Sequence, residues 1–90
     1  MVAFEWDEAK SVTNMKKHGV AFDEAATSFY DPLGVETRDE RSSTREERWV
    51  RLAMSVRRRL LLTVFVERDD WIRIISSRKA SARETKQYEG

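Results

Sequence analysis

The stretch that decides the fold covers residues 49–77 and reads WVRLAMSVRRRLLLTVFVERDDWIRIISS. In residues 49–56 apolar side chains alternate with polar or small ones, which is typical of a strand with one buried face. Residues 60–66 are nearly all apolar, as expected of a central strand covered on both faces. Residues 71–77 alternate again, and short charged turns separate the three segments. The stretch therefore predicts three consecutive antiparallel strands that form a meander.

The residues before this stretch predict two helices. Asp7 can cap a helix over residues 8–18, and Gly19 can end that helix in the left-handed conformation. A second, shorter helix is predicted to start at a cap on Asp23 and to end near Tyr30.

Residues 34–38 can add a fourth, edge strand to the sheet. After the meander, Ser81 and Glu84 have the spacing of a capping box, which predicts a short last helix over residues 81–89. The predicted fold class is α+β, with two N-terminal helices, an antiparallel meander sheet of three to four strands and a short C-terminal helix. We expect residues 1–90 to form a single domain.

Composition excludes several classes of protein. The sequence has no cysteine and one histidine, His18, so neither a thiolate zinc site nor a histidine-cluster metal site is expected, and no cofactor is implied. No apolar run approaches the length of a membrane-spanning helix, so the default expectation is a cytoplasmic protein that does not associate with membranes.

The net charge of +1 hides an uneven distribution. Residues 1–45 carry 6 Lys or Arg against 9 Asp or Glu, whereas residues 46–90 carry 11 against 7. Arginine outnumbers lysine by 12 to 5, and its guanidinium group suits bidentate contact with phosphate. We therefore expect an anionic partner to meet the second half of the chain.

Arginines in or beside the predicted strands are candidates for phosphate contacts. Arg48 precedes the first strand of the meander, and Arg73 and Arg78 belong to the last one. A strand end that leads into a helix N-terminus combines cations, hydroxyl groups and free backbone N–H groups, which favours phosphate binding. Strict alternation, however, places Arg73 on the opposite face from Ser76 and Arg78, so the three share one site only if a bulge redirects one of them.

Two side chains are candidates for proton transfer, each with a structural alternative. Glu47 lies beside an arginine and can act as a base, or it can form a surface ion pair that includes Arg73 across the sheet. His18 can shuttle a proton, or it can be a cation that stabilises the end of a helix. Three aromatic residues also have two interpretations. They can stack on bases, or they can belong to the core or contact a partner: Trp49, Trp71 and Tyr88.

These residues, taken in order, resemble a known family, the BrnT family of bacterial toxins. The resemblance covers nearly the whole chain and rests on Phe4-Glu5-Trp6-Asp7, Lys10, Asn14, Lys17-His18-Gly19-Val20, Phe22-Asp23-Glu24-Ala25, Asp31-Pro32, Glu47-Arg48 and Arg73-Ile74-Ile75-Ser76-Ser77-Arg78-Lys79-Ala80, with Glu84 and Tyr88 near the end. It implies a RelE-like fold and a ribonuclease toxin of a type II toxin–antitoxin system that blocks translation by cutting RNA. It also implies a BrnA-like antitoxin with a ribbon-helix-helix domain, a 2:2 complex, and repression of the operon through promoter DNA.

Cleavage through the RNA 2′-hydroxyl needs a base, an acid and cations for the developing charge, and it needs no metal. The expected roles are transition-state charge for Arg73 and Arg78, substrate binding for Arg48, Lys79 and Ser76, and proton transfer for Glu47 or His18. The rival interpretation is a non-catalytic RNA- or DNA-binding module, or an inactive toxin that acts only as a co-repressor. We expect whichever of Trp49, Trp71 and Phe22 are exposed to contact the antitoxin.

Overall fold

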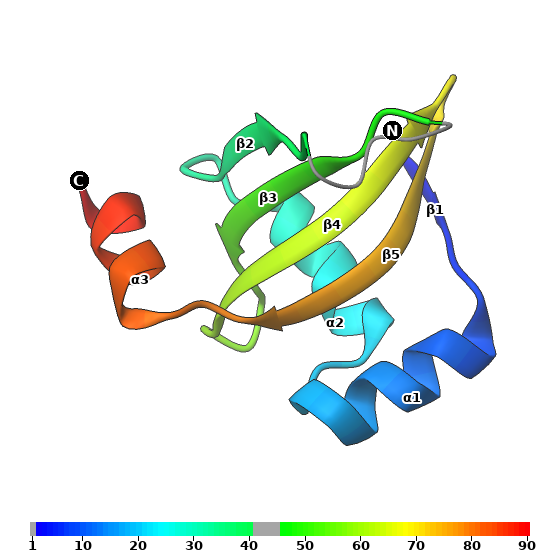
Figure 1. Cartoon of the computed structure of the whole chain (residues 1–90), viewed down its shortest axis with the longest axis horizontal. Helices are drawn as coiled ribbons and strands as arrows, with labels where there is room; N and C mark the ends of the chain where they lie inside the picture. Colours follow the sequence, from blue (N-terminus) through cyan, green and yellow to red (C-terminus); the bar gives the residue numbers. More distant parts are fainter. Residues whose placement is uncertain (1, 41–45) are drawn as a thin grey trace.

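The computed structural model describes residues 2–40 and 46–90 of the chain. Five strands form one sheet in the order β1-β5-β4-β3-β2, and Figure 1 shows α2 behind the sheet and α1 below it, next to β5. Helix α3 lies at one end of the sheet, beside β2 and β3 (Figure 1). The elements are β1 Ala3–Glu5, α1 Glu8–His18, α2 Phe22–Thr27, η1 Ser28–Tyr30 (a 3₁₀ turn), β2 Val35–Arg38, β3 Trp49–Met54, β4 Leu60–Arg68, β5 Trp71–Lys79 and α3 Ala82–Glu89.

Strands β2 to β5 form the predicted antiparallel meander, but the sheet as a whole is mixed. Strand β1 pairs in parallel with the start of β5, so that Glu5 stands beside Arg73. The prediction of three to four strands, all antiparallel, was therefore wrong by one parallel strand. A three-residue segment carries too little pattern to reveal a partner that lies almost seventy residues further along the chain.

The helices follow local signals at most of their ends. The Asp7 carboxylate accepts hydrogen bonds from the backbone of the first turn of α1, and Gly19 ends that helix with a φ of 71°. Both arms of the predicted capping box are present at the start of α3. The second helix differs from the prediction because its N-cap is Ala21, so that Asp23 lies within α2, and its last turn is the 3₁₀ turn η1.

The core lies between the sheet and helices α1 and α2. Its fully buried side chains come from the α1–α2 connection, from α2 and from the helix-facing side of the two central strands: Val20, Phe22, Ala25, Leu61 and Ile74. Burial of such side chains is the main favourable contribution to folding. No helix in the described part of the chain is both long and apolar enough to cross a membrane.

A β-bulge between β4 and β5 decides which side chains share a face. Phe65 pairs with Ile74, whereas Val64 pairs with Ser76, so one extra residue of β5 is inserted at this point. Ile74 faces the helices before the bulge and Ser77 faces them after it, because both are buried and both pair with buried residues of β4. The alternation of β5 is therefore reversed beyond the bulge.

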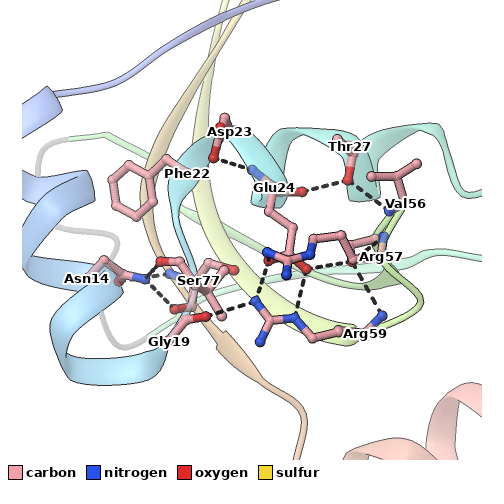
Figure 2. Close-up of polar contacts among 12 residues, drawn as sticks. Asn14, Gly19, Phe22, Asp23, Glu24, Thr27, Val56, Arg57, Arg59 and Ser77 are labelled. Atoms are coloured by element: carbon pink, nitrogen blue, oxygen red, sulfur yellow. Dashed lines mark hydrogen bonds and ion pairs between the residues drawn. The ribbon is translucent and has the colours of Figure 1, made fainter.

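A buried polar network fastens the helices to the sheet (Figure 2). The Asn14 amide donates to the carbonyl oxygens of Val20 and Ser77 at 2.8 and 2.7 Å, and its oxygen accepts from the Ser77 N–H. The Glu24 carboxylate, only 5% exposed, accepts from Arg59 and from Ser55 in the β3–β4 turn. Every buried polar side-chain atom of the described residues has a partner, so the network is complete.

Candidate functional site

The face of the sheet that points away from α1 and α2 carries the predicted arginines. Because the bulge reverses the alternation of β5, Arg73, Ser76 and Arg78 all lie on this open face. Their pairing partners on β4 are Val66, Val64 and Leu62. The bulge that the sequence analysis required is therefore present, and the three side chains point to the same face of the sheet. Arg73 and Arg78 nevertheless lie roughly 15 Å apart along β5, since each residue of a strand advances about 3.3 Å.

At the Arg73 end, arginines and carboxylates from four segments interleave. Glu5 of β1 lies between two guanidinium groups, with its oxygens 3.6 Å from Nη1 of Arg68 and 3.9 Å from Nη1 of Arg73. Arg68 also binds Glu46 through two hydrogen bonds of 2.9 and 2.8 Å. These bonds lower the pKa of Glu46, and the nearby charges of Arg48 and Arg73 lower it further. The charges of Arg48 and Arg73 therefore both affect the Glu46 carboxylate.

At the other end of the open face, the guanidinium group of Arg78 is bound to a carboxylate. Nη1 and Nη2 of Arg78 donate to the two oxygens of Glu84 at 2.8 and 2.9 Å. Glu84 also accepts from the backbone N–H of Ser81, so one side chain completes the capping box and joins β5 to α3. The hydrogen bonds from Arg78 are the main reason that the pKa of Glu84 falls to about 2.

Acidification is expected to loosen helix α3. The lowered pKa of Glu84 means that its contribution to stability is complete above its ordinary pKa of 4.5 and is lost as the pH falls towards about 2. The NMR signals of Arg78 Nε and of α3 are expected to shift together over this range. The variant Glu84→Gln should show the shifted α3 signals already at neutral pH, and a wild-type α3 that does not respond between pH 4.5 and 2 contradicts the prediction.

His18 and Ser76 both line a groove between α1 and the free edge of β5. The groove has a volume of about 270 Å³ and is also lined by Lys10, Lys17 and Ile75. His18 is exposed and ends α1, where a cation is favoured by the helix dipole. The structure thus brings His18 close to one predicted substrate-binding residue, but it places no contact between His18 and Arg73 or Arg78.

The remaining predicted site residues are spread along the strand ends. Glu47, with a side chain 63% exposed, lies 3.6 Å from Nε of Arg38 rather than beside Arg73. Lys79 is exposed at the end of β5, and on the sheet it pairs with Leu61 on the helix-facing side. The structural alternative, in which Arg73 pairs with a carboxylate such as Glu47, is found with Glu5 as the carboxylate.

The aromatic candidates differ in how exposed their side chains are. Trp71 is 48% exposed and lies on the open face two residues before Arg73. Phe22 is fully buried, and Trp49 pairs with Phe65 on the helix-facing side, so neither is an exposed contact for a partner. The Tyr88 hydroxyl donates to Asp31 at 2.6 Å and holds the end of α3.

Three charged residues of the Arg73 end were not singled out as site residues from sequence: Glu5, Glu46 and Arg68. Glu5 belongs to the quoted motif Phe4-Glu5-Trp6-Asp7, and that motif was the available signal. Its proximity to Arg73 depends on the parallel pairing of β1 with β5. In the described ranges, no three His, Asp or Glu side chains gather closely enough to hold a metal ion.

Fold and site together define a small α+β protein with α1 and α2 on one face of a mixed sheet and arginine–carboxylate clusters on the other face, where α3 covers one end. Residues 6–84 match the model of the family described as the ribonuclease toxin, BrnT, of type II toxin–antitoxin systems. The chain belongs to this BrnT family.

A solved structure has the same fold. The 1.1 Å crystal structure of the Brucella abortus ribonuclease toxin BrnT superposes with a TM-score of 0.64 and 21% sequence identity. The match covers 90% of this chain and 99% of the Brucella chain. No curated protein matches the sequence.

Proposed function

We propose that this protein is an endoribonuclease that cuts RNA by attack of a 2′-hydroxyl on the neighbouring phosphate, without a metal ion, and so blocks translation. Membership of the BrnT family supports the reaction class. The observation that carries the proposal for this chain is the bulge in β5, since it places Arg73, Ser76 and Arg78 on one open face. A row of cations and a hydroxyl group on a rigid strand suits a single-stranded polyanion.

In this proposal Arg73 stabilises the negative charge that develops on the oxygens of the phosphorane, and Arg78 contacts a second phosphate or assists Arg73. Arg48 and Ser76 hold the substrate backbone along the same strands, and Lys79 contacts it from the exposed end of β5. The exposed indole of Trp71 can stack on a base next to the cut. His18 and Glu47, the two candidates for proton transfer from the sequence, are both exposed, but both lie away from Arg73.

The proposed partner is a BrnA-like antitoxin with a ribbon-helix-helix domain, in a 2:2 complex that represses its own operon by binding promoter DNA. The family is that of type II systems, in which a toxin is paired with an antitoxin. Of the three aromatic residues considered for this contact, Trp71 has the required exposure. A partner that covers Trp71 would also cover Arg73 and keep RNA away from it.

The test combines growth with a defined cleavage assay. Expression without the antitoxin is expected to arrest growth. The purified protein is expected to cut an RNA oligonucleotide in the presence of EDTA and to leave intact the same oligonucleotide with 2′-deoxy residues. Salt-dependent binding without products supports a non-catalytic binding module, and repression with neither arrest nor cleavage supports a co-repressor.

A further inference from the structure

The carboxylates of the open face differ in whether their oxygens are already engaged. Both oxygens of Glu46 accept hydrogen bonds from Arg68, and both oxygens of Glu84 accept them from Arg78. The oxygens of Glu5 lie 3.6 and 3.9 Å from their arginine partners, beyond the length of a hydrogen bond. Within residues 2–40 and 46–90, no donor lies within hydrogen-bond distance of the Glu5 carboxylate.

The arginines of this face differ in the same way. The two terminal nitrogens of Arg78 both donate to Glu84, so a phosphate must displace that carboxylate before it can bind there. Among the described residues, Arg73 has one ion pair, a long one with Glu5, and its side chain is 30% exposed. Its donors remain available for a phosphate that arrives from the open face. The accessible cation and the accessible carboxylate are therefore neighbours, on strands paired so that Glu5 stands opposite Arg73.

We propose that Glu5 is the general base of the reaction and that the cut takes place at the Glu5–Arg73 end of the sheet. This inference rests on the proposed ribonuclease function and goes beyond it, because it assigns the proton acceptor. A carboxylate between two guanidinium groups can reach a hydroxyl group whose adjacent phosphate is held by one of those groups. His18 lies in the separate groove at the β5 edge, and Glu47 lies against Arg38, so neither is placed beside Arg73.

The step is a transesterification without a redox change. The Glu5 carboxylate takes the proton from the 2′-hydroxyl, and the 2′-oxygen forms a bond to phosphorus. The bond from phosphorus to the 5′-oxygen breaks, and that oxygen leaves with a proton from water. The products are a 2′,3′-cyclic phosphate and a 5′-hydroxyl end. Arg73 faces the phosphate throughout, and Arg68 keeps Glu5 in place from β4.

The test compares Glu5→Gln with Glu67→Gln, which removes an exposed carboxylate from the helix-facing side of the neighbouring strand β4. Single-turnover cleavage of a defined RNA oligonucleotide is measured from pH 4 to 9, and binding is measured on a non-cleavable oligonucleotide with 2′-deoxy residues. Glu5→Gln is expected to slow the chemical step about 100- to 10,000-fold, with binding changed less than about threefold. The wild-type rate should fall at acidic pH, because a protonated carboxyl group cannot accept the proton of the 2′-hydroxyl, and Glu5→Gln should lose that fall. Glu67→Gln should keep both the rate within about fivefold and the acidic fall.

Glu5→Asp is the control for a merely structural effect. It keeps the carboxylate but, with a side chain one methylene shorter, places it farther from the 2′-hydroxyl. It should cut more slowly than the wild type but retain the acidic fall in rate. A rate for Glu5→Gln close to that of the wild type, or equal losses in Glu5→Gln and Glu67→Gln, overturns the assignment of the base and leaves the ribonuclease proposal standing. A wild-type protein that makes no cyclic phosphate overturns both.

Discussion

Replacing Arg73 by alanine is expected to lower the rate of RNA cleavage about 100- to 1,000-fold. The guanidinium is held by β5 on the open face, where the Glu5 carboxylate, 3.9 Å away, competes for it. A preorganised donor aimed at a developing negative charge contributes more to the transition state than to substrate binding. The loss should therefore appear in kcat more than in KM, and single-turnover kinetics on a defined oligonucleotide separates the two.

Two other arginines serve as comparisons for Arg73→Ala. Arg83 is an exposed residue of α3, and Arg83→Ala is expected to change cleavage less than about threefold. Arg78→Ala is expected to raise KM and to affect kcat less than Arg73→Ala, because Glu84 already occupies both terminal nitrogens of Arg78. If Arg73→Ala folds and cuts RNA as fast as the Arg83 variant, the site does not lie at this end of the sheet.

Replacing Glu24 by alanine is expected to destabilise the fold by about 2–4 kcal/mol. The carboxylate is nearly buried and binds Arg59 at two nitrogens, while Arg59 also donates to the Gly19 carbonyl at 2.8 Å (Figure 2). Its removal leaves the Arg59 charge and the Ser55 hydroxyl without their partner in a region that excludes most water. This loss is a large fraction of the total stability of a small domain, about 5–15 kcal/mol.

Chemical denaturation measures this effect, with Glu89→Ala as the exposed control on α3. Hydrogen bonds from Arg59 lower the pKa of Glu24, so its contribution is complete above its ordinary pKa of 4.5 and is lost as the pH falls through the lowered value. The difference between wild type and Glu24→Ala should thus shrink in acid. A difference that is small at neutral pH, or that does not change with pH, contradicts the role of this pair.

The open-face cluster and the Glu24 network show different limits of sequence-based prediction. Asp7, Gly19 and the capping box of α3 were predicted correctly, because a cap acts on backbone groups two or three residues away. Asp23 was assigned wrongly as a cap, since a second helix start was available two residues earlier at Ala21. Local preference decides such ends only where no competing start lies within one turn.

The candidate site depended on two features that local pattern does not carry. The bulge in β5 inserts one residue, and only the register with β4 shows where this occurs. The parallel pairing of β1 brings Glu5 to Arg73 from the opposite part of the chain. Without these two features, Arg73 would lie on the other face from Ser76 and Arg78, and Glu5 would remain a residue of an extended entry segment.

By itself, the sequence determined the α+β class, the antiparallel meander, the helix caps and the resemblance to the BrnT family, because these depend on periodicity, on neighbours within a few residues and on ordered motifs. The tertiary structure decided which charged groups face one another. Arg68 and Arg73 each meet Glu5, Arg78 meets Glu84, and Arg59 meets Glu24. A charge on a strand can pair with any partner that the register brings within about 4 Å, and register is set by the packing of the whole sheet.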